Sequence, residues 1–369
     1  MPRRDDLRIR TVRLRGMQST IGDPRLWGSR IFGADAGFRL KAGNPLSDEE
    51  SIWATMPQRC RDLAPLDERR VFVALNDRTA ALYEEGKKEA TWKRPFSLAP
   101  ESYLSAGPIV ITAAEEDGTL HAIDPTTGKT RWTRKVQTSP WTVQSSCDTT
   151  FLRQADGVVL VPDKRLKPTQ LECVDAATGK SLWTVRPDAE LGQVAIGKDL
   201  VVLGSGSGRV TALERETGEP AFEVALCPKF TRADYRMAID IAPGGRQVYA
   251  AVDGTVWALD AATGRTLWQW KWQVLKAINP PAPSHQPTPR LYAVEDGLFA
   301  LFNWSEPHRD FPPPEHVDVV RFTADGTMVL HETSPSLRGH WYAFVAGNRL
   351  ALSTGGSLWE VWEFLPAAP

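Results

Sequence analysis

The sequence lacks the features that mark several large classes of protein. It has only four cysteines, with no CxxC pair, and no stretch of about 18 apolar residues that could form a membrane-spanning helix. Its beginning, MPRRDDLRIRTVRLRG, contains no apolar run of roughly 7 to 15 residues, which a secretory signal requires. We therefore expect a cytoplasmic protein whose thiols are reduced and mostly buried: Cys60, Cys147, Cys173 and Cys227.

There is also no excess of charge of one sign. The 44 Lys and Arg residues nearly balance the 45 Asp and Glu residues, which gives a formal net charge of −1. With this balance, no global field attracts nucleic acid or an anionic membrane. We expect neither a specific nucleic-acid partner nor insertion into a membrane.

The motifs of the common catalytic and metal sites are absent as well. The sequence contains no G-x-S-x-G, GxxxxGK[ST] or HExxH motif and no Asp-x-Asp-x-Asp calcium loop. Five of the six histidines fall in the last quarter of the chain, but their spacing matches no ligand pattern. The glycine-rich run Ser205–Gly208 precedes an apolar stretch, which favours a turn over a phosphate-binding loop. These absences predict no catalytic residue, no metal and no cofactor.

What the sequence does have is one motif, repeated four times. The stretch Gly254–Trp268, GTVWALDAATGRTLW, recurs as Gly118–Trp132, Leu171–Trp183 and Gly208–Phe222. In every copy an acidic residue stands four positions before a glycine, and an aromatic residue stands four positions after that glycine. The four triplets are Asp124, Gly128 and Trp132; Asp175, Gly179 and Trp183; Glu214, Gly218 and Phe222; and Asp260, Gly264 and Trp268. Glycines roughly 40 to 50 residues apart have the period of propeller or solenoid repeats.

Each position of the motif has a physical role. The apolar run before the acid predicts a strand that is buried on both faces. The acidic side chain can accept hydrogen bonds from backbone N–H groups two or three residues on, which starts a tight turn. The glycine takes the left-handed conformation that closes a hairpin with a bulge. The aromatic ring then fills the gap between adjacent sheets, where a Trp N–H needs an acceptor.

These residues resemble the tryptophan-docking repeat of the pyrroloquinoline-quinone-type (PQQ-like) β-propellers. The resemblance implies an all-β fold, namely a single β-propeller of four-stranded blades that spans residues 1–369. Weaker copies extend it beyond the four clear ones. These copies are Gly28–Leu40 with Trp53 as the docking aromatic, Val71–Trp92 with Gly86, Leu291–Phe302 with Val317–Phe322 as the outer strand, and Arg349–Trp362.

The number of blades follows from the small turn that precedes each inner strand. These turns lie at Gly37, Asp77, Gly118, Gln170, Gly208, Gly254, Gly297 and Gly356. They predict eight blades, and seven is the alternative, with residues 16–56 as an insertion. The β-prone stretch Leu7–Arg15, within the N-terminal segment 1–16, is expected to pair with the last blade and so to close the ring.

The family that the repeat resembles includes quinone-dependent dehydrogenases as well as scaffold proteins. The dehydrogenases carry a disulfide between adjacent cysteines, a catalytic Asp and calcium-binding groups, and none of these can be placed in this sequence. The resemblance therefore implies a non-catalytic scaffold, similar to the propeller of bacterial outer-membrane protein assembly. Such a scaffold binds protein partners, which we expect to be components of a larger assembly or regulatory system.

The binding residues are expected in loops on one rim, because propeller function usually resides in loops on a rigid scaffold. The insertion 303–316, NWSEPHRDFPPPEH, interrupts a hairpin with aromatic and charged residues. The predicted partner-binding residues are Trp304, His308, Arg309, Asp310 and Phe311, with Trp341 and Tyr342 near the last blade. The alternative function is a small-ligand sensor or enzyme with its site at the central channel. For that site the predicted residues are Trp141, Gln144, Arg232, Asp234 and Tyr235.

Overall fold

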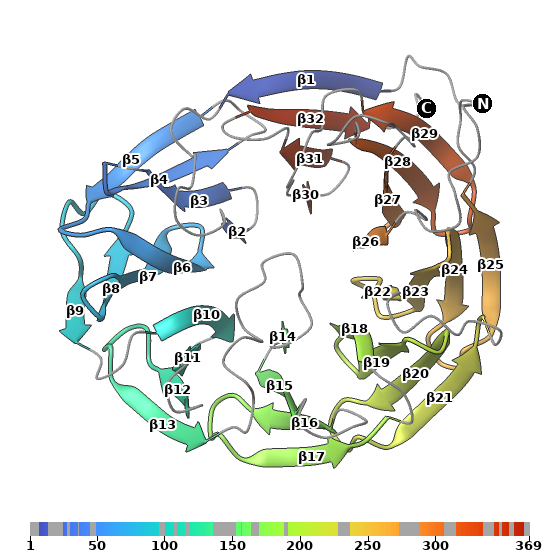
Figure 1. Cartoon of the computed structure of the whole chain (residues 1–369), viewed down its shortest axis with the longest axis horizontal. Coiled ribbons are helices and arrows are strands. Elements are labelled where there is room, and N and C mark those ends of the chain that lie inside the picture. Colours follow the sequence, from blue (N-terminus) through green and yellow to red (C-terminus); the bar gives the residue numbers. More distant parts are fainter. Residues whose placement is uncertain are drawn as a thin grey trace. The chain divides into compact units, whose positions relative to one another are not determined.

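The computed structural model shows an all-β chain (Figure 1). It describes residues 7–13, 25–27, 30–35, 37–44, 49–95, 100–106, 109–114, 119–135, 153–155, 157–163, 170–187, 191–227, 237–272, 288–305, 315–334, 343–346, 349–353 and 358–364. Within these residues the elements are strands joined by turns. No described segment forms a helix that is long and apolar enough to cross a membrane.

The chain divides into two compact units, and most of the sheets lie within one unit or the other. The first unit comprises Arg10–Arg186 and Gly356–Val361. It holds four four-stranded sheets, each with its strands in chain order. Their strands are β2 (Arg25–Trp27), β3 (Arg30–Ala34), β4 (Arg39–Asn44), β5 (Glu49–Thr55); β6 (Cys60–Asp67), β7 (Arg70–Leu75), β8 (Thr79–Glu84), β9 (Trp92–Pro95); β10 (Pro100–Ala106), β11 (Ile109–Ala114), β12 (Thr119–Ile123), β13 (Thr130–Lys135); and β14 (Arg153–Ala155), β15 (Val158–Asp163), β16 (Gln170–Asp175), β17 (Ser181–Val185).

The second unit comprises Met1–Ile9, Pro187–Gly355 and Trp362–Pro369. It holds three more sheets of the same kind. Their strands are β18 (Leu191–Ile196), β19 (Leu200–Ser205), β20 (Arg209–Glu214), β21 (Pro220–Ala225); β22 (Ala238–Ile241), β23 (Gln247–Val252), β24 (Thr255–Asp260), β25 (Thr266–Lys271); and β26 (Thr288–Val294), β27 (Gly297–Ser305), β28 (Glu315–Thr323), β29 (Met328–Ser334).

One further sheet contains both ends of the described chain. Its strands are β1 (Leu7–Arg13), β30 (Ala343–Ala346), β31 (Arg349–Ser353) and β32 (Leu358–Phe364). The order in this sheet is β1-β32-β31-β30, so the N-terminal strand is an edge strand next to β32. The number of blades and the closure of a ring stay predictions.

The middle strands of the sheets are buried, whereas along the fourth strands burial alternates from one residue to the next. In β7 and β23, the second strands of their sheets, every residue after the first is buried. The strand before the acid is predicted to be buried on both faces; the four inner residues of β24 are buried, whereas β16 and β20 each have one half-buried residue among their inner four. The fourth strand β13 instead alternates between half-buried and exposed residues. Its half-buried positions include Trp132, so one face of the strand packs inward while the other faces solvent.

The β26–β29 sheet differs from the one predicted from the sequence. Gly297 is predicted in the turn that precedes an inner strand, but it is itself the first residue of the second strand, β27. The stretch Val317–Phe322, expected as the outer strand, lies in the third strand, and Met328–Ser334 is the fourth. The reason is a turn at Asp325 and Gly326, whose φ of 89° only glycine adopts readily. The glycine on which the aromatic ring of the preceding sheet docks is therefore Gly326.

Candidate functional site

The turns of the repeat motif adopt the predicted conformation. The carboxylate of Asp124 accepts hydrogen bonds from the N–H groups of Thr126 (2.9 Å) and Thr127 (3.2 Å). The Gly128 N–H donates to the Asp124 carbonyl at 2.8 Å, and Gly128 has a φ of 68°. The same carbonyl-to-glycine bond measures 2.8 Å in the copies that begin at Asp175, Glu214 and Asp260. All four hairpins also contain the expected bulge, just before the acidic residue.

The aromatic residues of the motif dock on the turn of the next sheet, and the glycine makes room for the ring. A Cβ built on Gly128 would lie 2.8 Å from the ring of Trp92, and one on Gly179 would lie 2.6 Å from the ring of Trp132. Gly264 meets the ring of Phe222 in the same way, at 2.5 Å. The glycine is therefore required twice, for its backbone conformation and for its missing side chain.

The indole N–H groups donate to the same position in each docking turn. The carbonyl that accepts belongs to the second residue of the next docking turn. The bonds run from Trp92 to Pro125 (2.8 Å), from Trp132 to Ala176 (2.9 Å) and from Trp268 to Ala324 (3.1 Å). These bonds confirm that the docking Trp needs a partner for its N–H group.

A second cross-sheet contact was not foreseen from the sequence. Arg94 and Arg134 each stand two residues after a docking Trp, on the same face of the strand. Their guanidinium groups donate to the carbonyls of Gly128 (2.7 Å) and Gly179 (3.0 Å) in the next sheet. Arg134 also pairs with Glu172. The signal was the repeated Trp-x-Arg triplet, but its backbone acceptor leaves no trace in the sequence.

The first docking residue, Trp53, differs from the others. It is buried and packs edge-on against Phe32, with 5.2 Å between the ring centroids. Its indole N–H donates to the Ser51 hydroxyl in its own strand, at 3.1 Å. A Cβ on Gly86, the glycine expected beneath it, would meet nothing within 4 Å. Trp53 thus fills a core position without the cross-sheet bond of the later copies.

Most of the predicted binding residues lie outside the described residues. This holds for the partner-binding residues His308, Arg309, Asp310, Phe311, Trp341 and Tyr342, and for the channel residues Trp141, Gln144, Arg232, Asp234 and Tyr235. The backbone of Trp304 is described, and it pairs with His316 near the end of the β27–β28 hairpin. The strands of this hairpin have nine residues each, whereas β23 and β24 have six.

A buried carboxylate lies on this long hairpin. The side chain of Asp318 is fully buried. Its two oxygens accept hydrogen bonds from the Thr333 hydroxyl at 2.7 Å and from the indole N–H of Trp272 at 2.8 Å. The His331 Nε2 lies 3.4 Å from the same carboxylate, and its ring packs edge-on against Trp270. The cluster joins the β27–β28 hairpin to Trp270 of strand β25 and to Trp272, which follows that strand.

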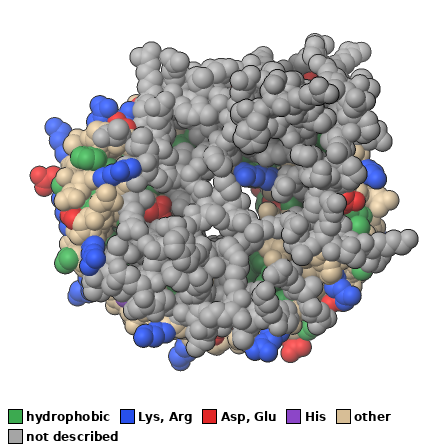
Figure 2. All heavy atoms as spheres, in the orientation of Figure 1, with side chains coloured by type: hydrophobic (Ala, Val, Ile, Leu, Met, Phe, Trp, Pro, Cys, Tyr) green, Lys and Arg blue, Asp and Glu red, His purple; other side chains and the backbone are tan. Residues whose placement is uncertain are grey.

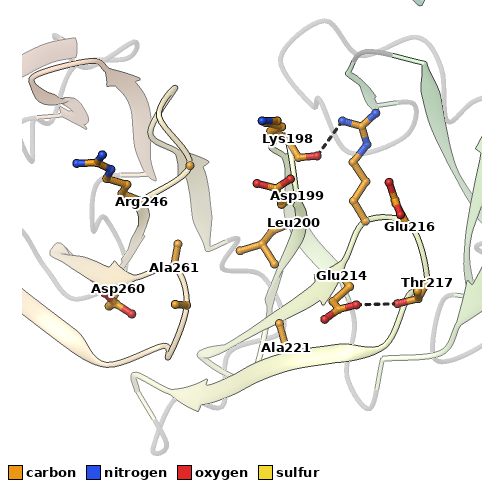
Figure 3. Close-up of a pocket in the computed structure, with 13 residues that line it drawn as sticks. Lys198, Asp199, Leu200, Glu214, Glu216, Thr217, Ala221, Arg246, Asp260 and Ala261 are labelled. Carbon is orange, nitrogen blue, oxygen red and sulfur yellow. Dashed lines mark hydrogen bonds between the residues drawn. The ribbon is translucent and has the colours of Figure 1, made fainter.

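A groove runs between the sheets β18–β21 and β22–β25 (Figure 3). Its volume is about 770 Å3, and it is bordered by residues 198–200, 214–217 and Ala221 of one sheet and 245–246 and 260–262 of the other. Two backbone bonds hold its walls, from Arg215 N–H to Asp199 O (2.9 Å) and from Ala261 N–H to Arg246 O (3.0 Å). The groove therefore has a fixed frame of turns that carry charged side chains of both signs.

Surface charge elsewhere is mixed. Figure 2 shows Lys and Arg side chains interspersed with Asp and Glu over the described surface of the face in view. This distribution agrees with the balanced composition. Among the described residues no group of three or more His, Cys, Asp or Glu side chains is arranged to hold a metal ion.

Comparison with known proteins decides the family. The family profile described as outer membrane protein assembly factor BamB matches residues 38–172 and 167–305. These matches cover more than half of the chain. It belongs to the PQQ-like β-propeller repeat family. A search of curated proteins gave no match.

Solved structures support the propeller fold at low sequence identity. BamB from Moraxella catarrhalis superposes with a TM-score of 0.60 at 16% identity, and the match covers 98% of this chain and 99% of that one. The computationally designed Ika8 protein gives 0.66 at 16%, over 95% of this chain and 98% of that one. Hsv2 from Kluyveromyces lactis gives 0.53 at 11%, over 80% and 90%. At these identities the likeness shows the fold alone.

The family match corrects the expected cytoplasmic location. The profile that matches the propeller repeats is that of an outer membrane protein assembly factor, which is not a cytoplasmic role. The expectation rested on the lack of an apolar N-terminal run, and an absence of that kind carries little weight against a positive match. The cytoplasmic assignment is therefore wrong.

The cysteine prediction is confirmed for two of the thiols. Cys60 and Cys173 are buried, and Cys227 is half-buried. None of these three forms a disulfide with another described cysteine, and Cys147 lies outside the described residues. Burial raises the pKa of the Cys60 thiol, with a further contribution from the nearby charge of Asp62. A thiol of this kind stays protonated and unreactive at neutral pH.

The docking turns predict that the stability of the folded protein changes with pH in the acid range. The Thr263 hydroxyl and N–H groups donate to Asp260 and lower the pKa of its carboxyl group. A carboxyl group whose pKa is lower in the folded state stabilises that state above its unfolded pKa of about 3.9, and this contribution is lost as pH falls through the folded pKa. Replacing Thr263 by valine should raise the pKa of Asp260 and move the acid-unfolding midpoint to higher pH.

Carboxyl titration by NMR and an acid-unfolding curve measure these two changes. The matched control is Thr184→Val, because Thr184 is an exposed threonine on the fourth strand β17. A Thr263→Val variant that titrates like the control would show that the hydroxyl does not hold the carboxylate in solution.

Proposed function

We propose that this protein is a non-catalytic β-propeller scaffold that binds protein partners of a larger assembly through loops on one rim. The family assignment supports this proposal, because the matching profile is described as an assembly factor. In the described repeats, turns are tied to the neighbouring sheet by indole and guanidinium hydrogen bonds. A rigid frame lowers the entropic cost of binding for the surface that it presents.

The length of the β27–β28 hairpin supports the position that we propose for the interface. Strand β27 ends at Ser305 and strand β28 begins at Glu315, and each has nine residues. The second and third strands of the preceding sheet have six each. In the sequence the longer strands flank the segment 306–314, and Trp304 pairs with His316 next to the last pair, Ser305 with Glu315. This segment contains the predicted interface residues His308, Arg309, Asp310 and Phe311.

Affinity capture from a lysate of the source organism that includes solubilised membranes tests the proposal. The variant Trp304→Ala, Arg309→Ala, Phe311→Ala should lose a partner that the natural protein captures, because aromatic and Arg side chains dominate protein interfaces. The control carries three exposed substitutions on and after the β8–β9 turn: Lys88→Ala, Glu89→Ala and Lys93→Ala. It should retain the partner.

Both variants should melt at the temperature of the natural protein. If the loop variant captures the same partner as the control, the hairpin is not the interface. If the natural protein captures nothing while a small molecule raises its melting temperature, the protein is a ligand-binding propeller instead.

A further inference from the structure

Two large side chains stand at turn positions that glycine occupies elsewhere in the chain. In several turns the last residue donates its N–H to the carbonyl three residues earlier and has a positive φ. Gly208 does so with a φ of 77°, Gly245 with 68° and Gly326 with 89°. In the turns β3–β4 and β7–β8 the same place is taken by Phe38 (60°) and Arg78 (66°).

Both residues strain the backbone. The left-handed conformation is routine for glycine, but a Cβ makes it costly, and bulky residues adopt it rarely. The third residue of this kind among the described ones is Asp253, and aspartate tolerates the conformation better. Strained residues cluster at active sites and ligand-binding sites, where the strain is part of the function. Phe38 and Arg78 are therefore candidates for a function that glycine would not perform.

The Phe38 turn is held by side chains of its own sheet. The Asp35 carboxylate accepts the N–H groups of Gly37 (2.9 Å) and Arg39 (3.0 Å). It also accepts the Arg39 Nε–H at 2.7 Å, and the Nζ of the buried Lys41 lies 3.6 Å from it. Phe38 itself is 39% exposed. The turn thus presents an aromatic ring to solvent from a hydrogen-bonded frame.

Backbone hydrogen bonds join this turn to the turn of the next sheet. The Met56 N–H donates to the Phe38 carbonyl at 2.8 Å, and the Asn76 N–H donates to the Arg59 carbonyl at 3.0 Å. The segment 56–59 therefore connects the two turns, and both sheets lie within the first compact unit. We call the exposed residues of these segments the Phe38–Arg78 surface. They are Gly37, Phe38, Arg39, Pro57, Gln58, Arg59, Asn76, Asp77 and Arg78.

The charge of the Phe38–Arg78 surface favours a negatively charged partner. The surface has three arginines and one acid, Asp77, whose carboxylate accepts the Thr79 N–H at 3.0 Å. Aromatic and Arg side chains supply much of the binding energy of protein interfaces, where opposite charges face one another across the contact. An aromatic ring among cations thus fits an apolar side chain among carboxylates.

We propose that the Phe38–Arg78 surface binds a segment of a partner protein in which carboxylates flank an apolar residue. The apolar side chain would pack on the ring of Phe38, and the carboxylates would pair with the guanidinium groups of Arg59 and Arg78. Arg39 can join them, because a guanidinium has five N–H donors and the bonds to Asp35 use only some of them. The inference adds a second surface to the proposed function, and it rests on that function in taking the partner to be a protein.

Two synthetic peptides with blocked ends test the inference without the natural partner. One repeats Glu-Glu-Leu twice, and the other repeats Lys-Lys-Leu twice. By fluorescence anisotropy the acidic peptide should bind the natural protein about tenfold more tightly than the basic one, because like charges repel across the contact. Phe38→Gly and Arg78→Gly should each weaken binding of the acidic peptide about fivefold, as expected for the loss of one exposed contact.

The same two variants also measure the strain. Glycine relieves it, so both should melt at the temperature of the natural protein or slightly above, although they bind the peptide less tightly. Matched controls are Ile52→Ala and Arg69→Ala, which remove an exposed apolar side chain and an exposed cation elsewhere in the same two sheets. Both controls should bind the acidic peptide as the natural protein does.

Three results would overturn the inference: equal binding of the two peptides, glycine variants that bind normally, or glycine variants that lose binding and stability together. Binding to vesicles of anionic phosphatidylglycerol without binding of the acidic peptide would assign the surface to a membrane and overturn it as well. None of these results affects the hairpin interface, because both variants of the capture experiment leave residues 37–78 unchanged.

Discussion

Replacing Gly179 by valine should destabilise the protein by about 3 kcal/mol, the sum of a backbone cost of roughly 1–2 and a packing cost of similar size. Gly179 has a φ of 71°, where a β-branched residue is strained. A Cβ at this position would lie 2.6 Å from the ring of Trp132, and the ring is held by its bond to Ala176. The new side chain must therefore push the docking Trp away from its acceptor.

The change can be measured by denaturant unfolding followed by tryptophan fluorescence. Gly86→Val is the matched control, because Gly86 has a φ of 81° but meets nothing within 4 Å. The control should show only the backbone cost, about 1–2 kcal/mol. Equal losses in the two variants would mean that docking of Trp132 on Gly179 contributes nothing to stability.

Replacing Asp318 by alanine should cost about 3 kcal/mol, because the removal of one partner from a buried polar cluster leaves the others unsatisfied. The donors left behind are the indole N–H of Trp272 and the hydroxyl of Thr333. Both were bonded to a fully buried carboxylate. The variant should also loosen the β27–β28 hairpin around Asp318.

The conservative variant Asp318→Asn keeps the volume of the side chain but changes its hydrogen bonds, so it separates the two contributions to stability. Its amide oxygen can still accept one bond, so it should lose about half as much stability as alanine. Hydrogen exchange at the backbone of Val317 and Val319 reports whether the loss is local to the hairpin. If alanine and asparagine behave alike, the two hydrogen bonds do not stabilise the folded state.

The fold could be predicted from the sequence because the docking turn is local. Asp260, Gly264 and Trp268 lie within nine consecutive positions. Asp260 and Gly264 act through a bond and a conformation of their own hairpin, and the turn that they form fixes the position of Trp268 in the sequence. Four copies of this pattern identified the repeat. The sheet β26–β29 was misaligned because its turn has Thr323 where the other copies have an acid, and the acid Asp325 comes two residues later.

The candidate sites were harder to predict because they depend on what faces each side chain across a sheet boundary. Nothing in the sequence shows that the turn of Phe38 is bonded through the segment 56–59 to the turn of Arg78 in the next sheet. The guanidinium bond from Arg94 to a backbone carbonyl is equally invisible. Asp318 looks like one of many acids until its burial against Trp272 is known.

The docking bonds also have a consequence for synthesis of the chain. Donor and acceptor are separated by 33 residues for Trp92, 44 for Trp132 and 56 for Trp268. Each of these rings can therefore dock only after the following sheet has left the ribosome. A nascent chain always ends in a sheet whose outer aromatic ring still faces water, and the apolar surface open to misassociation stays limited to one sheet interface as translation proceeds.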